Sequence, residues 1–268
     1  MNNLHRELAP VSAEAWAQID QEAARTLKRY LGARRVVDVV GPKGLECSAV
    51  GTGRLQAIEP PGAGIEAAQR EVRALAQLRV PFELSREAID SVARGANDPD
   101  LQPLKDAART MAHAEDRAVF GGYAPAGIQG IGPASSNPAT SLPSDASRYP
   151  AAIAAAVSTL RDAGVNGPYR LVLGGKAYTA AAGTTDDGYP ILKNIRQLVD
   201  GEIVWAPGID GGVVLTARGG DYELHLGEDI SIGYLGHSDT TVRLYLQETF
   251  TFLPLTSEAA VVLAPHGG

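Results

Sequence analysis

The clearest alternation of hydrophobic and polar positions lies near the end of the chain, between Thr241 and Phe252. One face of this segment would carry only apolar side chains apart from Glu248: Val242, Leu244, Leu246, Phe250 and Phe252. A repeat of two residues is typical of a strand with one buried face, and each apolar side chain could contribute about 1.5–3 kcal/mol on full burial. We therefore expect this strand to anchor a sheet that earlier segments join.

Glu248 interrupts that apolar face. A buried carboxylate without a partner is costly, so the position predicts an arginine partner or an opening to solvent. A catalytic role is the alternative, but no second acid and no cluster of metal ligands accompanies Glu248 nearby in the sequence.

A helix is expected close to the N-terminus, where apolar residues recur every three or four positions: Trp16, Ile19, Ala23, Leu27 and Tyr30. Ser12 precedes this stripe and is a suitable N-cap, and Gly32 marks the end. Residues 34–40 follow, and their β-branched side chains predict a strand that ends at Gly41. Such a strand would place Arg34, Val36 and Asp38 on one face.

The segment from Ser48 to Gln77 gives conflicting signals. Gly51, Gly53 and the turn residues 60–62 favour a hairpin, whereas residues 66–77 have a helix-forming composition. Local reasoning alone predicts a helix over 66–77.

The next segments have clearer patterns. Leu78–Leu84 alternates as a strand, and Ser85 caps a short helix that runs to Val92. A longer helix is expected from Asp98–Pro99 to Gly121–Gly122, with a buried stripe of Leu101, Leu104, Ala108, Met111 and Ala118.

The second half begins with a loop rich in glycine, proline and serine, residues 127–150. Beyond it we expect helices over 151–163, 176–182 and 191–199, and strands over 169–173, 203–205 and 213–216. The polar loop 183–190 lies between two of these helices and carries two acids at its tip.

Composition narrows the functional classes. The 268 residues are 44% hydrophobic, enough for one large domain or two modest ones, and the net charge is −7. An acidic chain is not a general binder of nucleic acids or anionic membranes, which need a positive face. Cys47 is the only cysteine, which fits a reducing interior, and the sequence has neither a signal-peptide pattern nor a run long enough to span a membrane. We therefore expect a cytoplasmic protein.

Motifs for catalysis or cofactor binding are incomplete. The glycines of Gly127–Gly132 have the wrong spacing for a dinucleotide fingerprint, and His113 with Glu115 matches the zinc-deaminase pattern without its two cysteine ligands. Gly236–Thr240 begins like a nucleophile elbow but has threonine where the second glycine belongs, so a turn between strands explains it better. The five histidines, at positions 5, 113, 225, 237 and 266, have no metal-binding spacing. We expect no catalytic residue, no bound metal and no cofactor.

An ordered set of short motifs runs along the whole chain. The motifs are Met1–Leu4 with Leu8–Pro10, Arg34–Val39, Ile89–Asp90 with Arg94–Gly95, Glu115–Asp116, Gly167–Tyr169, Gly188–Pro190, Arg218–Asp221, Ser231–Tyr234 and Leu246–Phe250. No single motif is decisive, but nine in order are specific, and together they resemble the encapsulins, also known as the linocin-like bacteriocin family.

The resemblance implies an α+β protein with the tailed-phage major capsid fold. It implies an N-terminal helix and the first part of a peripheral domain in 1–47, and an extended intersubunit loop in 48–77. The peripheral domain with its long helix would continue over 78–130. An axial domain around the five-fold pore would occupy 131–218, and the return strands of the peripheral domain 219–268. The extended loop contradicts the helix predicted locally over 66–77, and we favour the loop because pairing between subunits can override a weak propensity.

The function implied by the resemblance is structural. Encapsulins of bacteria self-assemble into an icosahedral nanocompartment, a virus-like particle of about sixty copies in the simplest case. The shell encloses a cargo enzyme, a dye-decolourising peroxidase or a ferritin-like iron oxidising protein. The alternative is a hydrolase or a bacteriocin-like secreted factor, in which Ser238, His237 and Asp239 or Glu248 would act.

Particular residues match family positions. Arg34 and Asp38 match positions that line the groove for a C-terminal cargo peptide, and Ile230 matches an apolar position of that groove; an intramolecular ion pair is the alternative role for the two charged residues. The loop around the five-fold pore corresponds to Thr184, Thr185, Asp186, Asp187, Gly188 and Tyr189. Some encapsulins stack a flavin on a tryptophan where this chain has Glu87, so we expect little bound flavin although Arg79 is retained.

Overall fold

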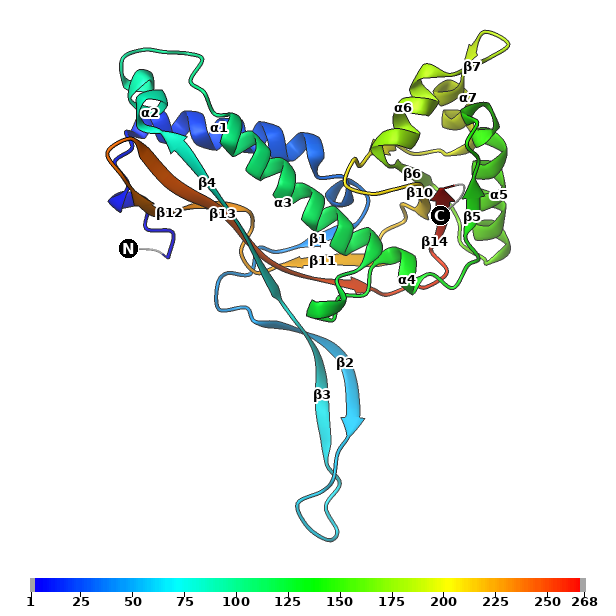
Figure 1. Ribbon diagram of the computed structural model, residues 1–268. Helices are drawn as coiled ribbons and strands as arrows, with labels where there is room; N and C mark the ends of the chain where they lie inside the picture. Colours follow the sequence, from blue (N-terminus) through cyan, green and yellow to red (C-terminus); the bar gives the residue numbers. More distant parts are fainter. Residues whose placement is uncertain (1–2, 266–268) are drawn as a thin grey trace.

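The computed structural model describes residues 3–265, which form two lobes and a long hairpin arm (Figure 1). Met1 and Asn2 of the first motif, and residues 266–268 at the end of the range 219–268, lie outside the described residues. One lobe contains a sheet with two long helices, and the other a second sheet with three shorter helices. The arm extends away from both lobes.

The first sheet is organised around the predicted C-terminal strand. Its strands are β1 (Asp38–Val40), β4 (Ala76–Ser85), β11 (Tyr222–Leu226), β12 (Ser231–His237) and β13 (Thr241–Pro254). β13 pairs antiparallel with β4, β11 and β12, and β1 adds to β11 in parallel. The expectation that this strand anchors a sheet is confirmed.

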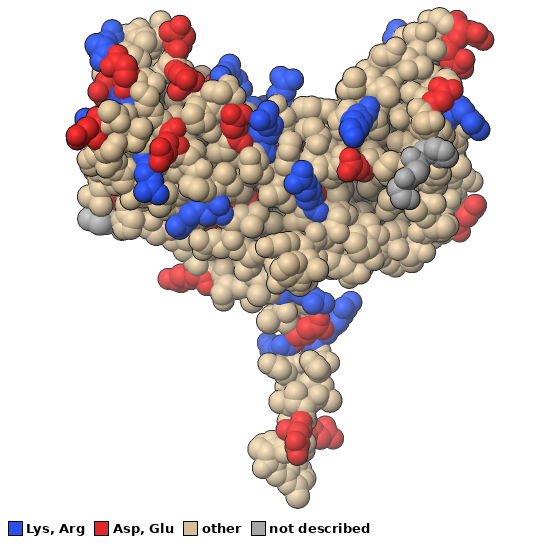
Figure 2. Space-filling view, in the orientation of Figure 1, with Lys and Arg blue, Asp and Glu red and all other residues tan. Residues whose placement is uncertain are grey.

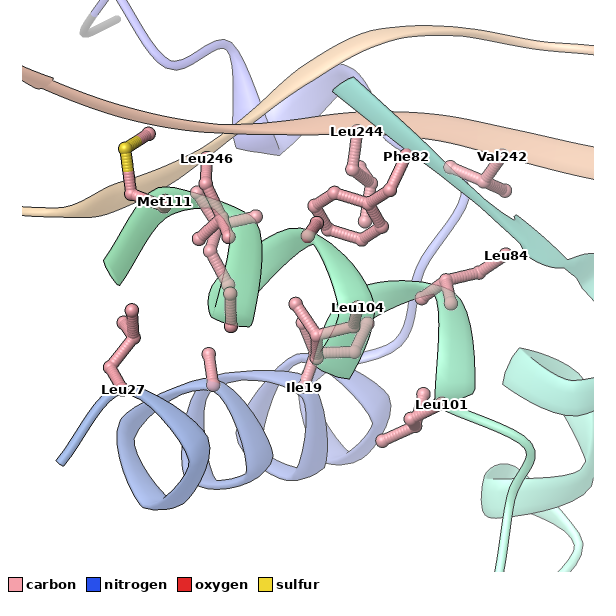
Figure 3. Packing of buried hydrophobic residues seen from close by; sticks show 14 of the residues in the cluster. Ile19, Leu27, Phe82, Leu84, Leu101, Leu104, Met111, Val242, Leu244 and Leu246 are labelled. Atoms are coloured by element: carbon pink, nitrogen blue, oxygen red, sulfur yellow. The ribbon is translucent and has the colours of Figure 1, made fainter. Parts of the chain in front are cut away.

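Helices α1 (Ala13–Tyr30), α2 (Arg86–Ala93) and α3 (Gln102–Gly121) belong to the same lobe. Ser12 and Ser85 cap α1 and α2 as predicted, since their side-chain oxygens accept the amides of Ala15 and Ala88 at 3.2 and 3.4 Å. α3 packs between the sheet and α1, so that its apolar side chains contact β4 and β13 on one side and the stripe of α1 on the other. Figure 3 shows this shared core with Ile19, Leu27, Leu101, Leu104, Met111, Phe82, Leu84, Val242, Leu244 and Leu246. This core positions the polar residues of the neighbouring segments.

The second sheet has the strand order β5-β14-β10-β6-β9. Its strands are β5 (Thr140–Leu142), β6 (Tyr169–Leu173), β9 (Ile203–Trp205), β10 (Gly212–Thr216) and β14 (Ala260–Pro265), and its helices are α5 (Tyr149–Asp162), α6 (Gly175–Gly183) and α7 (Ile191–Leu198). β14 pairs with β10 and β5, so the last strand belongs to the second lobe rather than with the return strands expected over 219–268. The other domain boundaries remain predictions.

The arm corrects the local prediction of a helix over 66–77. It is an antiparallel hairpin of β2 (Ala49–Ala57) and β3 (Ala68–Ala74), and the chain continues from β3 into β4. The extended loop expected over 48–77 from the resemblance matches this geometry. Weak helix propensity is overridden because β3 pairs with β2 along its length.

Two further segments differ from the sequence reading. Residues 33–35 form a 3-10 turn, η2 (Ala33–Arg35), and β1 begins only at Asp38, so no single strand spans 34–40. The predicted loop 127–150 contains the short helix α4 (Ile131–Ala134), strand β5 and the turn η4 (Ala146–Arg148). The remaining short elements are η1 (Arg6–Leu8), η3 (Ala124–Ala126), β7 (Thr185–Asp186) and β8 (Tyr189–Pro190).

Candidate functional site

Arg34 lies at the centre of a cluster of carboxyl groups beside the first sheet. Its Nε and Nη2 atoms donate to Glu115 of α3 at 2.9 and 2.6 Å, and Nη2 also reaches Glu248 of β13 at 3.3 Å. Its Nη1 donates to Asp229, in the loop before β12, at 2.7 Å. Only 17% of the Arg34 side chain is exposed, so most of its donor capacity serves the subunit itself.

The two buried acids of this cluster depend on a single guanidinium. Glu115 and Glu248 both have fully buried side chains, and Oε1 of Glu248 has no hydrogen-bond partner among the described residues. Burial first, and then the charge of Glu115, raise the pKa of Glu248 well above its ordinary value. Burial disfavours the charged form of Arg34 and would lower its pKa, but the hydrogen bonds and negative charges of Glu115 and Asp229 outweigh this effect and raise the pKa. The arginine partner expected for Glu248 is confirmed.

Asp116, the neighbour of Glu115 on α3, fixes the turn that carries Arg34. Its carboxyl oxygens accept the amides of Gly32 and Ala33 at 3.1 and 2.8 Å. Burial raises the pKa of Asp116 to about 7, although both backbone hydrogen bonds favour its charged form. The turn replaces the predicted strand because these two backbone donors bond to a side chain instead of to a neighbouring strand.

Ile230 is joined to Arg34 through Asp229. Oδ1 of Asp229 accepts both Nη1 of Arg34 and the amide of Ile230, each at 2.7 Å. The Ile230 side chain is half-buried and packs against the core formed by α1, α3 and the first sheet. The fold therefore brings together Arg34 and Ile230 of the predicted groove.

Asp38 has a different environment, which corrects the expectation that it shares a strand face with Arg34. It is the exposed first residue of β1, and its Oδ2 accepts the amide of Gly220 at 2.6 Å. Gly220 belongs to the turn before β11, in which Arg218 forms an ion pair with Asp221 at 2.7 Å. Neither Arg34 nor Asp38 pairs with the other; each bonds to a different part of the first lobe.

The predicted pore loop is a tight hairpin that projects from the second lobe. β7 and β8 pair through Asp186 and Tyr189, and the two residues between them, Asp187 and Gly188, have φ values of 44° and 81°. Such a two-residue turn needs positive φ at both central positions, for which aspartate followed by glycine is well suited. Figure 2 shows acidic side chains at the end of this projection.

The hairpin is fixed at its base and exposed at its tip. The Thr184 hydroxyl donates to the carbonyl of Ala180 at 2.8 Å, which ties the loop to α6. Thr185, Asp186, Asp187 and Tyr189 are exposed. The two carboxylates can therefore act on solutes or on neighbouring copies, but they make no site within one subunit.

The residues considered for flavin binding have partners within the subunit. Glu87, in the first turn of α2, forms an ion pair with Arg94. Arg79 donates to Oε1 of Gln247 at 3.0 Å and stacks over the ring of Tyr245 at 4.1 Å. The expectation of little bound flavin stays a prediction.

The residues of the hydrolase alternative do not form a catalytic arrangement. The Oγ atom of Ser238 accepts the amides of Thr240 and Thr241, as expected of a turn between strands. His237 pairs with Tyr234 instead of Ser238, and Glu248 is held by Arg34. Within residues 3–265, no group of three or more possible ligands could hold a metal ion, and none of the helices is long and apolar enough to cross a membrane.

Sequence reasoning missed Glu115 and Asp229 as members of the Arg34 cluster. The sequence gives Glu115 two other readings, as a member of the motif Glu115–Asp116 and by its spacing from His113, and on a helix that spacing places the two residues on different faces. The available signal was the pair Glu115–Asp116 within an otherwise apolar helical stripe, since two adjacent buried acids require cationic or backbone partners.

Comparisons with known proteins agree along the whole chain. The family Linocin_M18, described as "Encapsulating protein for peroxidase", matches residues 1–251. The chain is 55% identical over 264 residues to a type 1 encapsulin shell protein of Rhodococcus erythropolis, covering 98% of this chain and 100% of the relative. It is 54% identical, with the same coverage, to the type 1 encapsulin shell protein of Mycobacterium tuberculosis.

Solved structures with similar folds are capsid-like particles. A virus-like particle from Pyrococcus furiosus aligns with a TM-score of 0.66 at 14% identity, covering 94% of this chain and 100% of that chain. The capsid of Myoviridae phage XM1 aligns with a TM-score of 0.57 at 12% identity, covering 88% and 92%. These similarities establish the tailed-phage major capsid fold.

Proposed function

The chain belongs to the encapsulins, which form capsid-like shells, and we propose that about sixty copies close into one icosahedral compartment around a cargo enzyme in the cytoplasm. The main support for this proposal is the exposure of apolar side chains on the arm. Leu55 and Val72 of the arm are 69% and 53% exposed, so a single subunit leaves them without a core. A neighbouring copy would cover them.

A peroxidase is the cargo that we favour. The description of the matching family names a peroxidase as the encapsulated protein. A ferritin-like iron oxidising protein is the other cargo expected from the resemblance. In either case the shell contributes enclosure rather than chemistry, and its relatives are named as shell proteins and not as enzymes.

Cargo capture is assigned to the surface around Ile230. A short C-terminal segment of the cargo enzyme would lie in a groove with Ile230 as an apolar contact and Asp38 at a separate polar end. Support comes from the half-exposure of Ile230 and from the exposed carboxylate of Asp38. Peptide grooves commonly combine one apolar anchor with backbone and charge contacts.

Passage of solutes is assigned to the hairpin of β7 and β8. If five copies meet at a vertex, Asp186 and Asp187 supply about ten carboxylates around one opening. Such a ring attracts cations and repels anions over about 8 Å at physiological salt. The exposure of both side chains supports this assignment; the alternative is that they solvate a loop that points away from the pore.

The test is to express the chain with a dye-decolourising peroxidase, with and without the last residues of the peroxidase, and to examine the purified protein by electron microscopy and native mass measurement. We expect one closed particle of megadalton order, and peroxidase activity that co-purifies only when its C-terminal segment is present. A stable monomer at micromolar concentration would exclude the shell, and capture of the truncated peroxidase would exclude docking through that segment.

A further inference from the structure

Arg34 has little donor capacity left for a bound peptide. A guanidinium has five N–H groups, and three of its nitrogens already serve Glu115, Glu248 and Asp229. The side chain is also largely covered. Only one N–H, on Nη1, is left, so a cargo peptide that took any further donor of Arg34 would have to displace a carboxylate, and burial makes an unpaired charge on Glu115 or Glu248 costly.

The contact of Arg34 that reaches the surface is Asp229. The Asp229 side chain is about half exposed, and the same oxygen that binds Arg34 also accepts the amide of Ile230. This one oxygen thus fixes the backbone at Ile230 relative to Arg34. Without the ion pair, the corner formed by Asp229 and Ile230 would lose its link to η2 and α3.

We propose that Arg34 serves cargo docking as a positioning residue, which holds the Asp229–Ile230 corner in place, and that the buried acids Glu115 and Glu248 control how firmly it does so. This inference rests on the proposed function of Ile230 in the cargo groove. It assigns the carboxyl pair a role that goes beyond the stability of the subunit.

The buried acids control the corner because they compete with Asp229 for the guanidinium of Arg34. The charged groups that face Glu248 are Arg34 from η2, Glu115 from α3 and Asp229 from the loop before β12; Asp116 of α3 faces the backbone of η2. While Glu248 is protonated, Arg34 is balanced by Glu115 and Asp229. When Glu248 ionises, it draws the guanidinium inward, and the exposed Asp229 is the partner most readily given up because solvent can replace Arg34 there.

This competition determines the direction in which pH changes the rigidity of the Asp229–Ile230 corner. The pKa of Glu248 is raised in the folded subunit, so its neutral form persists above the pH at which an exposed glutamate ionises. The corner should be firm at low pH and loosen as pH rises through the raised pKa. We therefore compare the corner at about pH 5, just above the ordinary range of an exposed glutamate, with the corner at about pH 9.

Hydrogen exchange of the Ile230 amide measures the corner without any cargo. In assembled empty shells we expect the protection of this amide, corrected for the intrinsic exchange rate, to fall about tenfold from the lower to the upper pH limit. Loss of the hydrogen bond between Arg34 and Asp229, which joins two charged groups, would produce a change of this size. Glu248→Gln mimics the protonated acid and should keep the protection high and constant with pH. Glu83→Gln, an exposed acid of β4, is the matched control and should behave as wild type.

Equal pH dependence in wild type and Glu248→Gln would overturn the proposal. A second measurement tests the positioning role directly, through co-purification of a co-expressed dye-decolourising peroxidase with shells carrying Arg34→Lys, Asp229→Asn or both. We expect each single change to reduce capture and the double change to add little, because both break the same link. Independent, additive losses would contradict a shared role. Hydrogen exchange could follow the prediction while the capture of peroxidase stays the same in every variant. That result would support control by the ion pair and refute the docking role of Ile230, so failure of this inference can be distinguished from failure of the proposed cargo groove.

Discussion

Gly233 of β12 lies directly beneath the ring of Tyr245 of β13, so close that a Cβ atom at Gly233 would be 2.1 Å from Cζ of the ring. The ring cannot move freely, because Arg79 stacks on it and its hydroxyl donates to the carbonyl of Asn3 at 3.3 Å. The glycine thus lets an aromatic side chain cross the strand and hold the N-terminal segment on the sheet.

Gly233→Ala should destabilise the shell, because the added methyl group forces the Tyr245 ring away from both partners. Overpacking of this kind costs about 1–3 kcal/mol, and we expect a lower midpoint of thermal unfolding for the assembled particle. Gly236→Ala on the same strand is the control, since its Cβ would meet nothing within 4 Å. Equal midpoints for the two variants would show that the ring adapts without cost.

The arm provides a test of assembly that leaves the cores untouched. Leu55→Asp places a charge on an exposed apolar position of β2, where full burial of the leucine side chain by a neighbour would contribute about 1.5–3 kcal/mol. We expect the yield of closed particles to fall at least tenfold while the subunit keeps its circular dichroism spectrum. Gln56→Asp, the adjacent position whose side chain points to the other face of the strand, should assemble as wild type. Normal assembly of Leu55→Asp would mean that this face of the arm stays free in the shell.

The elements predicted best from the sequence are those whose apolar residues pack on a core of the subunit. The alternation around Leu244 and the stripe around Ile19 have cores of their own chain to pack against, and the structure confirms both. The arm is different, because β3 extends away from both lobes and its conformation is set by pairing with β2 rather than by packing on a core. Local propensity has no access to such a pairing, whereas the family resemblance does.

The polar cluster could be predicted only in part. The position of Glu248 on an apolar strand face indicates an arginine partner, but not which of the arginines provides it. The sequence predicts a strand at Arg34, whereas the structure has a turn there. This turn, which orients Arg34 toward Glu248, is held by Asp116, more than eighty residues away. Contacts between such distant residues have no periodic signal in a single sequence, so the cluster became visible only in the fold.

Ile230→Asp tests the cargo groove apart from the shell. A carboxylate in place of the apolar contact should reduce the amount of co-purified peroxidase at least tenfold, because docking would take an unpaired charge out of water as well as lose the apolar contact. Assembly should persist, since the arm and the acidic hairpin are unchanged. Leu235→Asp, at an exposed apolar position within β12, is the matched control and should load normally. Unchanged peroxidase content in Ile230→Asp particles would refute the assignment.

The acidic hairpin predicts a selective opening in the shell. Asp186→Asn with Asp187→Asn removes two negative charges from each subunit without altering side-chain size, and Gly188 keeps the positive φ that the turn requires. We expect the double variant to lose preference for a small cation over an anion of equal size, measured by the response of a reporter enclosed in the particle. The effect should be largest at low salt, where exposed charges are least screened.

The control for this experiment must change the net charge equally at sites away from the hairpin. Asp162→Asn with Asp239→Asn does so, because both acids are exposed and neither lies in β7, β8 or the turn between them. Wild-type selectivity in the control and loss of selectivity in the hairpin variant would assign the filter to Asp186 and Asp187. An unchanged ratio of cation to anion entry in the hairpin variant at low salt would show that these two carboxylates point away from the route by which solutes enter.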